Sequence, residues 1–118
     1  MTNLLIIGCG NVGSRHLQGA ILANKKLNIS IVEPNKISII KAKRRISELK
    51  KVKLKKVLFY KSIKNIKENI DIVIVATNSI NRKKIIEEII NRKKIKFLIL
   101  EKVVCQSIYD FNQIIKKT

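Results

Sequence analysis

Short runs of consecutive hydrophobic residues alternate along the chain with longer segments in which hydrophobic residues recur every three or four positions. Most of the runs are rich in Val and Ile, which is typical of β-strands buried on both faces of a parallel sheet. The runs are Leu4–Ile7, Ile29–Val32, Val57–Tyr60, Ile72–Val75 and Phe97–Leu100. The pattern therefore predicts five strands.

The segments between the runs have the spacing of helices that bury one face. The three clearest stripes consist of Leu17, Ala20 and Ile21, then Ile39, Ala42, Ile46 and Leu49, then Ile85, Ile86, Ile89 and Ile90. A weaker helix is expected over Ser62–Asn69 and a last one over Ser107–Lys117. Strands that alternate with helices predict an α/β fold, a doubly wound parallel sheet covered on both faces, with strand order 3-2-1-4-5. Residues 1–118 are expected to form this one domain.

A glycine-rich segment follows the first expected strand and opens the first expected helix. The chain reads GCGNVG from Gly8 to Gly13, and a G-x-G-x-x-G pattern in this context is typical of dinucleotide binding. The first glycine allows the tight turn, Gly10 lets a diphosphate approach the backbone, and the third lets the helix pack closely on the sheet. Backbone N–H groups at the helix start, including those of Asn11 and Val12, would hold the phosphate oxygens.

An acidic residue at the end of the second expected strand completes this pattern. Glu33 lies 20 residues beyond Gly13, where a carboxylate accepts hydrogen bonds from the adenosine ribose hydroxyls and repels a 2′-phosphate. Pro34 and Asn35 follow, and no adjacent Arg is available to receive that phosphate. These residues favour NAD over NADP, although Lys36 would soften the preference.

The net charge of +18 raises the question of a nucleic-acid partner. However, 24 Ile, 21 Lys and 11 Asn are all encoded by codons rich in A and T, so codon bias explains the charge without a partner. The stretch Lys41–Lys56 holds nine basic residues, but the stripe that ends at Leu49 makes its first half an amphipathic helix with a solvated charged face. Because no aromatic residue interleaves the stretch to stack bases, nucleic acid is not an expected partner.

The remaining reactive residues are few. Cys9 and Cys105 are too few for a disulfide framework, and with the single His16 they do not predict a metal site. Reduced thiols fit a cytoplasmic protein, and no hydrophobic run approaches the ~20 residues that cross a bilayer. Cys9 has no candidate base beside it, which argues against a nucleophilic role. His16 is interpreted as a partly buried surface histidine.

Four segments together carry a family resemblance. They read IIGCGNVGSRHL, IVEP, DIVIVATNSINR and LILEKV, and they extend over nearly all 118 residues. In this order they resemble the nucleotide-binding half of the glucose–fructose oxidoreductase and inositol dehydrogenase family (Gfo/Idh/MocA). The resemblance implies a Rossmann fold, NAD(H) as the cofactor, and hydride transfer between nicotinamide and a sugar, polyol or sugar nucleotide.

The resemblance also implies roles for residues after the fourth and fifth strands. Ala76 and Thr77 match the family's Ala-Thr that borders the nicotinamide ribose, and Asn78 follows them. Glu101 and Lys102 match the first two residues of a Glu-Lys-Pro motif whose lysine lies beside the nicotinamide and the substrate hydroxyl. Lys102 is therefore the expected catalytic residue, because its charge would help to bind and deprotonate the alcohol as hydride leaves.

The chain departs from the family pattern in several places. Val103 and Asn78 replace prolines, and Arg82 occupies a position where many members have histidine. Family members also continue into a second domain that binds substrate, lines a dimer interface and supplies a proton-transferring histidine. We therefore expect these 118 residues alone to bind NAD(H) without turnover, and to meet a sugar-like substrate only together with such a domain.

Three other functions remain open at this point. A non-catalytic NAD-sensing module would explain the glycine loop and Glu33 but not the Glu101-Lys102 pair. A polyanion-binding domain would use Lys41–Lys56, and its affinity would fall steeply with added salt. A methyltransferase that binds S-adenosylmethionine also uses a glycine loop and an acid, but the third glycine, Gly13, and the Glu101-Lys102 pair argue against it.

Overall fold

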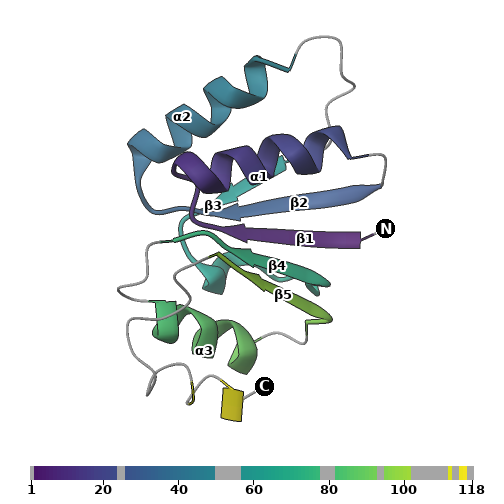
Figure 1. Ribbon diagram of the computed structural model, residues 1–118, viewed down its shortest axis with the longest axis vertical. Coiled ribbons are helices and arrows are strands. Elements are labelled where there is room, and N and C mark those ends of the chain that lie inside the picture. The colour runs from purple at the N-terminus through teal and green to yellow at the C-terminus, as the bar shows by residue number, and fades with distance from the viewer. Residues whose placement is uncertain are drawn as a thin grey trace.

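A five-stranded parallel sheet forms the centre of the molecule (Figure 1). The computed structural model describes residues 2–23, 26–49, 57–77, 82–92, 95–101, 112 and 115–116. The strands are β1 (Thr2–Ile7), β2 (Leu27–Val32), β3 (Val57–Tyr60), β4 (Ile72–Val75) and β5 (Phe97–Leu100). Their order is β3-β2-β1-β4-β5 with every neighbouring pair parallel, so the doubly wound topology predicted from the sequence is confirmed.

The helices form a layer on each side of the sheet. They are α1 (Asn11–Leu22), α2 (Lys36–Ser47) and α3 (Arg82–Arg92). Figure 1 shows α1 and α2 above the sheet and α3 below it. This arrangement follows from right-handed crossover connections, which place helices on opposite faces where the strand order reverses between β1 and β4.

The strands bury alternate residues on the two faces, as the period of two requires. On one face, Leu4 and Ile6 of β1 pack in a cluster with Leu17 of α1. On the other, Leu5 and Ile7 pack in a cluster with the isoleucines of α3. Because both faces are covered, the hydrophobic runs that predicted the strands are continuous instead of alternating with polar residues.

The expected helix over Ser62–Asn69 is wrong. Within this segment only Ile63–Asn65 forms a short 3-10 helix, and Ile66 already has an extended backbone. The connection must run from the carboxyl end of β3 back to the amino end of β4, which lies at the opposite end of the parallel strands. An extended chain covers about twice the length per residue of an α-helix, so a mostly extended path spans this distance with few residues. The helix expected over Ser107–Lys117 lies almost entirely outside the described residues.

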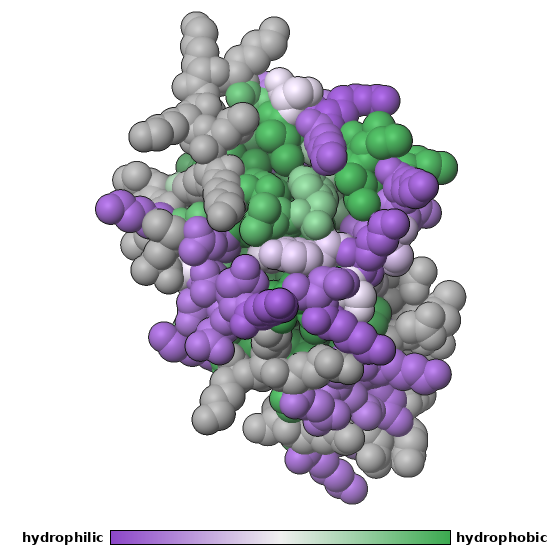
Figure 2. Space-filling model, turned by 180° about the vertical axis from the view of Figure 1, so that it is seen from behind, coloured by the Kyte–Doolittle hydropathy of each residue, from purple (hydrophilic) through white to green (hydrophobic). Residues whose placement is uncertain are grey.

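Hydrophobic side chains are also exposed on part of the surface. Ile37 and Ile40 on α2 and Leu58 on β3 are exposed. Figure 2 shows hydrophobic side chains gathered in the upper half of one face, the half that contains α2, and mainly hydrophilic side chains below. None of the helices in the described part of the chain has the length and apolar character needed to cross a membrane.

Replacing Asn35 by Ala is expected to lower the free energy of unfolding by about 1 kcal/mol, because the side chain caps α2. Its Oδ1 accepts hydrogen bonds from the N–H groups of Ile37 at 2.8 Å and Ser38 at 3.2 Å. Urea titration followed by circular dichroism measures the change. Asn35→Asp keeps the acceptor and is the matched control. Equal stability of the Ala and Asp variants would contradict the assigned cap.

Candidate functional site

The residues that follow four of the strands are aligned at one edge of the sheet, the edge formed by the carboxyl ends of the strands. In the register of the ladder, Val32, Ile7, Val75 and Leu100 are the last paired residues of β2, β1, β4 and β5. The next residue of each strand donates its N–H to a neighbouring strand, over 2.8–3.1 Å. These next residues are Glu33, Gly8, Ala76 and Glu101. The ladder therefore places four of the sequence-predicted site residues in one row, over roughly 14 Å at the usual strand spacing.

The glycine loop is closely packed at its first and third glycines. Gly8 has φ of +90°, and a Cβ there would lie 2.9 Å from the backbone nitrogen of Thr77. A Cβ on Gly13 would lie 1.9 Å from the carbonyl oxygen of Gly8. Because no side chain fits at either position, the start of α1 lies directly against the turn that leaves β1.

Gly10 differs from these two glycines because its α-carbon faces open space. A Cβ on Gly10 would have no atom within 4 Å. Gly10 is also the residue that precedes α1, and as a glycine it offers no side chain to cap the N–H groups of this helix start. The first N–H groups of a helix lack partners within the helix and attract anions. The loop thus combines an approachable backbone with donors for an anionic group.

Glu33 joins the end of β2 to the glycine loop. Its side chain is buried, and its Oε1 accepts a hydrogen bond from the N–H of Cys9 at 2.8 Å. Its Oε2 accepts from the N–H of Asn35 at 3.0 Å. A carboxylate has about four acceptor positions, so two remain for further donors such as ribose hydroxyls. Sequence reasoning placed Glu33 correctly at the strand end but did not foresee its bond to the loop.

A cavity of about 290 Å³ lies at this edge of the sheet. Gly8, Glu33 and Thr77 line it, so it contains residues that follow β1, β2 and β4. Within the described residues, the buried Oγ1 of Thr77 has no hydrogen-bond partner. Lys61 and Ser62 line the same cavity, and sequence reasoning missed them. Their position directly after a strand is the signal that would have identified them.

A smaller cavity, of about 180 Å³, lies at the opposite edge of the sheet. Asn3, Asn28 and Leu58, from the first halves of β1, β2 and β3, are among the residues that line it. Ligands of open α/β sheets bind at the carboxyl ends of the strands. The cavity that contains Gly8 and Glu33 is therefore the candidate site.

Cys9 is fully buried within the glycine loop. The pKa of its thiol is raised from 9.0 to about 11, chiefly by burial and also by the nearby Glu33 charge, and the Arg45 charge partly opposes this rise. A thiol with a raised pKa stays protonated at neutral pH and is a poor nucleophile. The burial of Cys9 and its raised pKa therefore agree with the sequence argument against a nucleophilic role.

Two residues treated as marginal in the sequence make long-range contacts at this edge. Arg82, the first residue of α3, is buried and donates hydrogen bonds to the carbonyl oxygens of Thr77 and Glu101. His16 of α1 pairs through Nε2 with the carboxylate of Glu101. His16 is partly exposed, as expected, but its partner lies 85 residues away in the sequence and no local pattern could have identified it.

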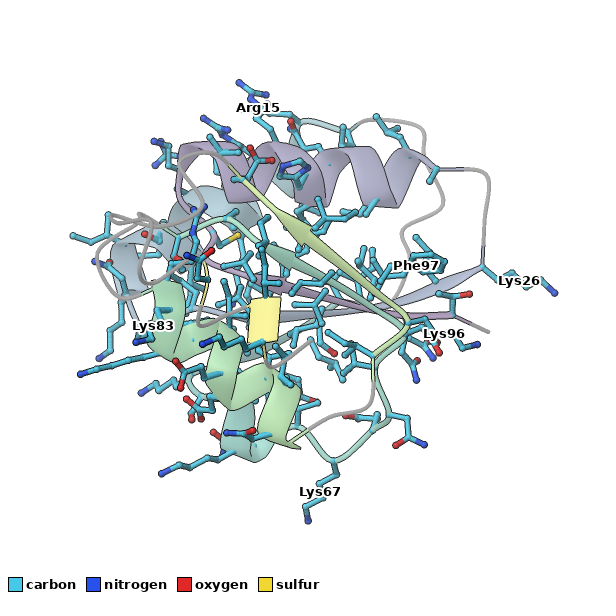
Figure 3. All side chains as sticks on the ribbon, turned by 60° about the horizontal axis from the view of Figure 1, so that its bottom comes forward. Arg15, Lys26, Lys67, Lys83, Lys96 and Phe97 are labelled. Carbon is cyan, nitrogen blue, oxygen red and sulfur yellow. The ribbon has the colours of Figure 1, made fainter. Side chains whose placement is uncertain are left out.

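Part of the predicted site cannot be placed. Asn78 and Lys102 lie outside the described residues, as do Cys105 and the second half of the basic stretch 41–56. In the described first half, the ammonium group of Lys43 lies 5.4 Å from the centre of the Phe59 ring. Figure 3 shows Arg15, Lys26, Lys67, Lys83 and Lys96 on separate elements around the molecule. In the part of the chain that can be described, no cluster of His, Cys, Asp or Glu could hold a metal ion.

The fold and the site define a doubly wound nucleotide-binding domain. Residues 2–118 match the family model described as "Oxidoreductase family, NAD-binding Rossmann fold" (GFO_IDH_MocA). The chain belongs to this family, and the resemblance inferred from the four sequence segments is confirmed. A search of the curated proteins found no match.

Solved structures share the fold at low sequence identity. The myo-inositol 2-dehydrogenase of Lactobacillus plantarum has a TM-score of 0.73 at 16% identity, over 98% of this chain and 32% of its own. The myo-inositol dehydrogenase of Lactobacillus casei, solved with NAD(H) and myo-inositol, has 0.72 at 14%, over 99% and 33%. The transcriptional regulator Gal80p of Kluyveromyces lactis has 0.73 at 13%, over 98% and 30%. This chain thus spans about a third of the length of each.

Replacing Gly13 by Ala is expected to destabilise the protein by about 1–3 kcal/mol, because the new methyl group would collide with the Gly8 carbonyl oxygen. Gly19→Ala in the same helix is the matched control, since a Cβ there meets no atom within 4 Å. The control should gain about 0.5–1 kcal/mol from helix propensity. Thermal unfolding of both variants measures the difference. A Gly13→Ala variant as stable as the parent, or stabilised like Gly19→Ala, would require a different packing of α1.

In a Cys105→Ala variant, where Cys9 is the only thiol, the folded protein should react with a disulfide reagent at pH 8 about a hundredfold more slowly than an ordinary thiol. Because the folded-state pKa is raised, stability should also fall as the pH rises from 9 to 11, and less so in Cys9→Ala. Absorbance kinetics and urea titrations measure the two effects. Rapid labelling of the folded protein would show that Cys9 is accessible.

Proposed function

We propose that this chain is the NAD-binding domain of an oxidoreductase that transfers hydride between nicotinamide and a hydroxyl-bearing carbon of a sugar, polyol or sugar nucleotide. The observation that carries the proposal is the bond between the Glu33 carboxylate and the Cys9 N–H. It joins the acid proposed to bind the ribose to the loop proposed to bind the diphosphate. The loop lies next to the point between β1 and β4 where the strand order reverses, and such sheets bind dinucleotides at that point.

The cofactor would lie across the row of strand ends. Gly8, Gly10 and Gly13 shape the loop, and the N–H groups of Asn11 and Val12 hold the diphosphate. Three features support this placement: the uncapped helix start, the open space at Gly10 and the Cys9–Glu33 bond. Glu33 would bind the adenosine ribose with its two remaining acceptor positions. A carboxylate there disfavours a 2′-phosphate, so we propose NAD over NADP.

The nicotinamide half would lie toward β4 and β5. Ala76, Thr77 and Asn78 would border its ribose, and the unpartnered Oγ1 of Thr77 supports this assignment. The bound nicotinamide supplies the hydride acceptor or donor. Lys102, one residue beyond Glu101, would bind the substrate hydroxyl and stabilise the negative charge that develops on its oxygen.

The substrate class rests on the family and its structural relatives. Two of these relatives are named as myo-inositol dehydrogenases, and one was solved with NAD(H) and myo-inositol. Because the 118 residues span about a third of these chains, we propose that they alone bind NAD(H) and do not turn over a substrate.

A regulatory NAD-sensing module is the second candidate. It is favoured by the fold shared with a transcriptional regulator. Lys102→Ala distinguishes the two functions when it is placed in a longer chain that carries a substrate-binding domain. NAD affinity should be nearly unchanged in both cases. Dehydrogenase turnover should be present before the substitution and lost after it only if the protein is catalytic.

The cofactor assignment predicts that NAD binds more tightly than NADP and S-adenosylmethionine in calorimetric titrations. In Glu33→Gln the preference for NAD over NADP should narrow by about tenfold, because the charge that repels the 2′-phosphate is removed. Glu68 is an exposed acid that does not line the cavity of Gly8 and Glu33. Glu68→Gln is therefore the matched control and should keep the original preference for NAD over NADP. Equal or tighter binding of NADP to the unsubstituted chain would refute the ribose assignment.

A further inference from the structure

Arg82 is the largest of the fully buried side chains among the described residues, with 2% of its surface exposed. Its guanidinium is always charged in proteins. Burying this charge is costly unless hydrogen-bond acceptors satisfy its N–H groups. This lysine-rich chain has only five arginines, and one of them lies in the interior. This placement indicates a specific task for the guanidinium group.

The contacts of Arg82 define that task. Nη1 donates a hydrogen bond to the carbonyl oxygen of Glu101, and Nη2 donates one to the carbonyl oxygen of Thr77. Thr77 and Glu101 lie just beyond β4 and β5, where the ladder between these two strands ends with the bond from the Glu101 N–H to the Val75 carbonyl oxygen. One planar group thus fixes the distance between the two strand ends. The fork of an arginine suits this task because its donors point in two fixed directions.

The same contacts extend to the helix that follows the glycine loop. The carbonyl oxygen of Glu101 binds Arg82, and its carboxylate pairs with His16 of α1. The chain of contacts runs from α3 through the end of β5 to α1. It lies at the β4–β5 end of the row of strand ends, on the other side of the glycine loop from Glu33.

We propose that Arg82 is a positioning residue that shapes the nicotinamide half of the dinucleotide site. The inference rests on the proposed function. With Glu33 at the adenosine side, an extended dinucleotide that crosses the glycine loop reaches β4 and β5 with its other half. Arg82 holds Thr77 by its carbonyl group and so determines where the buried, unpartnered Oγ1 of Thr77 points. Arg82 also holds Glu101, the residue before Lys102 in the sequence, by its carbonyl group.

The test compares NADH with ADP, which has the same adenosine and diphosphate but lacks the second ribose and the nicotinamide. In Arg82→Lys and Arg82→Gln, the affinity for NADH should fall three- to tenfold relative to that for ADP, as expected for one lost hydrogen bond. Calorimetry measures both affinities. Lys84→Met, an exposed residue of the same helix, is the control and should leave the ratio unchanged.

The outcomes separate this inference from the proposed function. If the unsubstituted chain binds neither ligand, the proposed function fails and this inference fails with it. If it binds both, but the ratio is the same in the Arg82 variants and the parent, only the role of Arg82 is overturned. A general loss of stability would lower the affinity for both ligands equally, so it would also leave the ratio of the two affinities unchanged.

A second measurement needs no variant and covers the case in which the Arg82 substitutions do not fold. Amide spectra of the unsubstituted chain are recorded with NADH and with ADP. The differences between the two spectra should concentrate at Thr77, Arg82 and Glu101. Differences confined to residues near Glu33 would overturn the assignment.

Discussion

The shared register of four parallel strands is the constraint on which the candidate site depends. Because β2, β1, β4 and β5 end at the same level, the chain leaves the sheet four times along one row, at Glu33, Gly8, Ala76 and Glu101. A shift of one residue in any strand would move its terminal residue out of the row and turn its side chains to the other face. The close packing of the strand side chains against both covered faces opposes such a shift. The packing of the core and the geometry of the site therefore have the same physical origin.

Two kinds of contact convert this row into a defined site. Short steric contacts hold the glycine loop, since neither Gly8 nor Gly13 has room for a methyl group. Polar bonds then connect the loop to its neighbours: Glu33 binds it from β2, and the Arg82–Glu101–His16 contacts connect β4, β5 and α1. The positive net charge plays no visible part in this arrangement. The labelled basic residues of Figure 3 are dispersed over the surface.

The sequence was sufficient for those parts of the structure that depend on local pattern. The bounds of β3, β4 and β5 and the strand order follow from short hydrophobic runs and crossover handedness. The segment after Ser62 was misjudged because the path back to β4, a tertiary requirement, overrides its weak helical spacing. The bond from Glu33 to Cys9 and the contacts of Arg82 were missed because their partners lie 19 to 24 residues away or are backbone atoms, which leave no sequence signal. Asn78 and Lys102 remain predictions from the family resemblance.

The central claim is that a diphosphate binds to the backbone N–H groups at the start of α1 while Glu33 binds the adjoining ribose. A nitrogen–proton correlation spectrum recorded during titration with NAD tests it most directly. We expect the largest shifts at the amides of Cys9, Gly10, Asn11 and Val12, with smaller ones around Glu33. Shifts that are absent from this loop and cluster at the opposite edge of the sheet, near Asn3 and Asn28, would show that the diphosphate binds elsewhere.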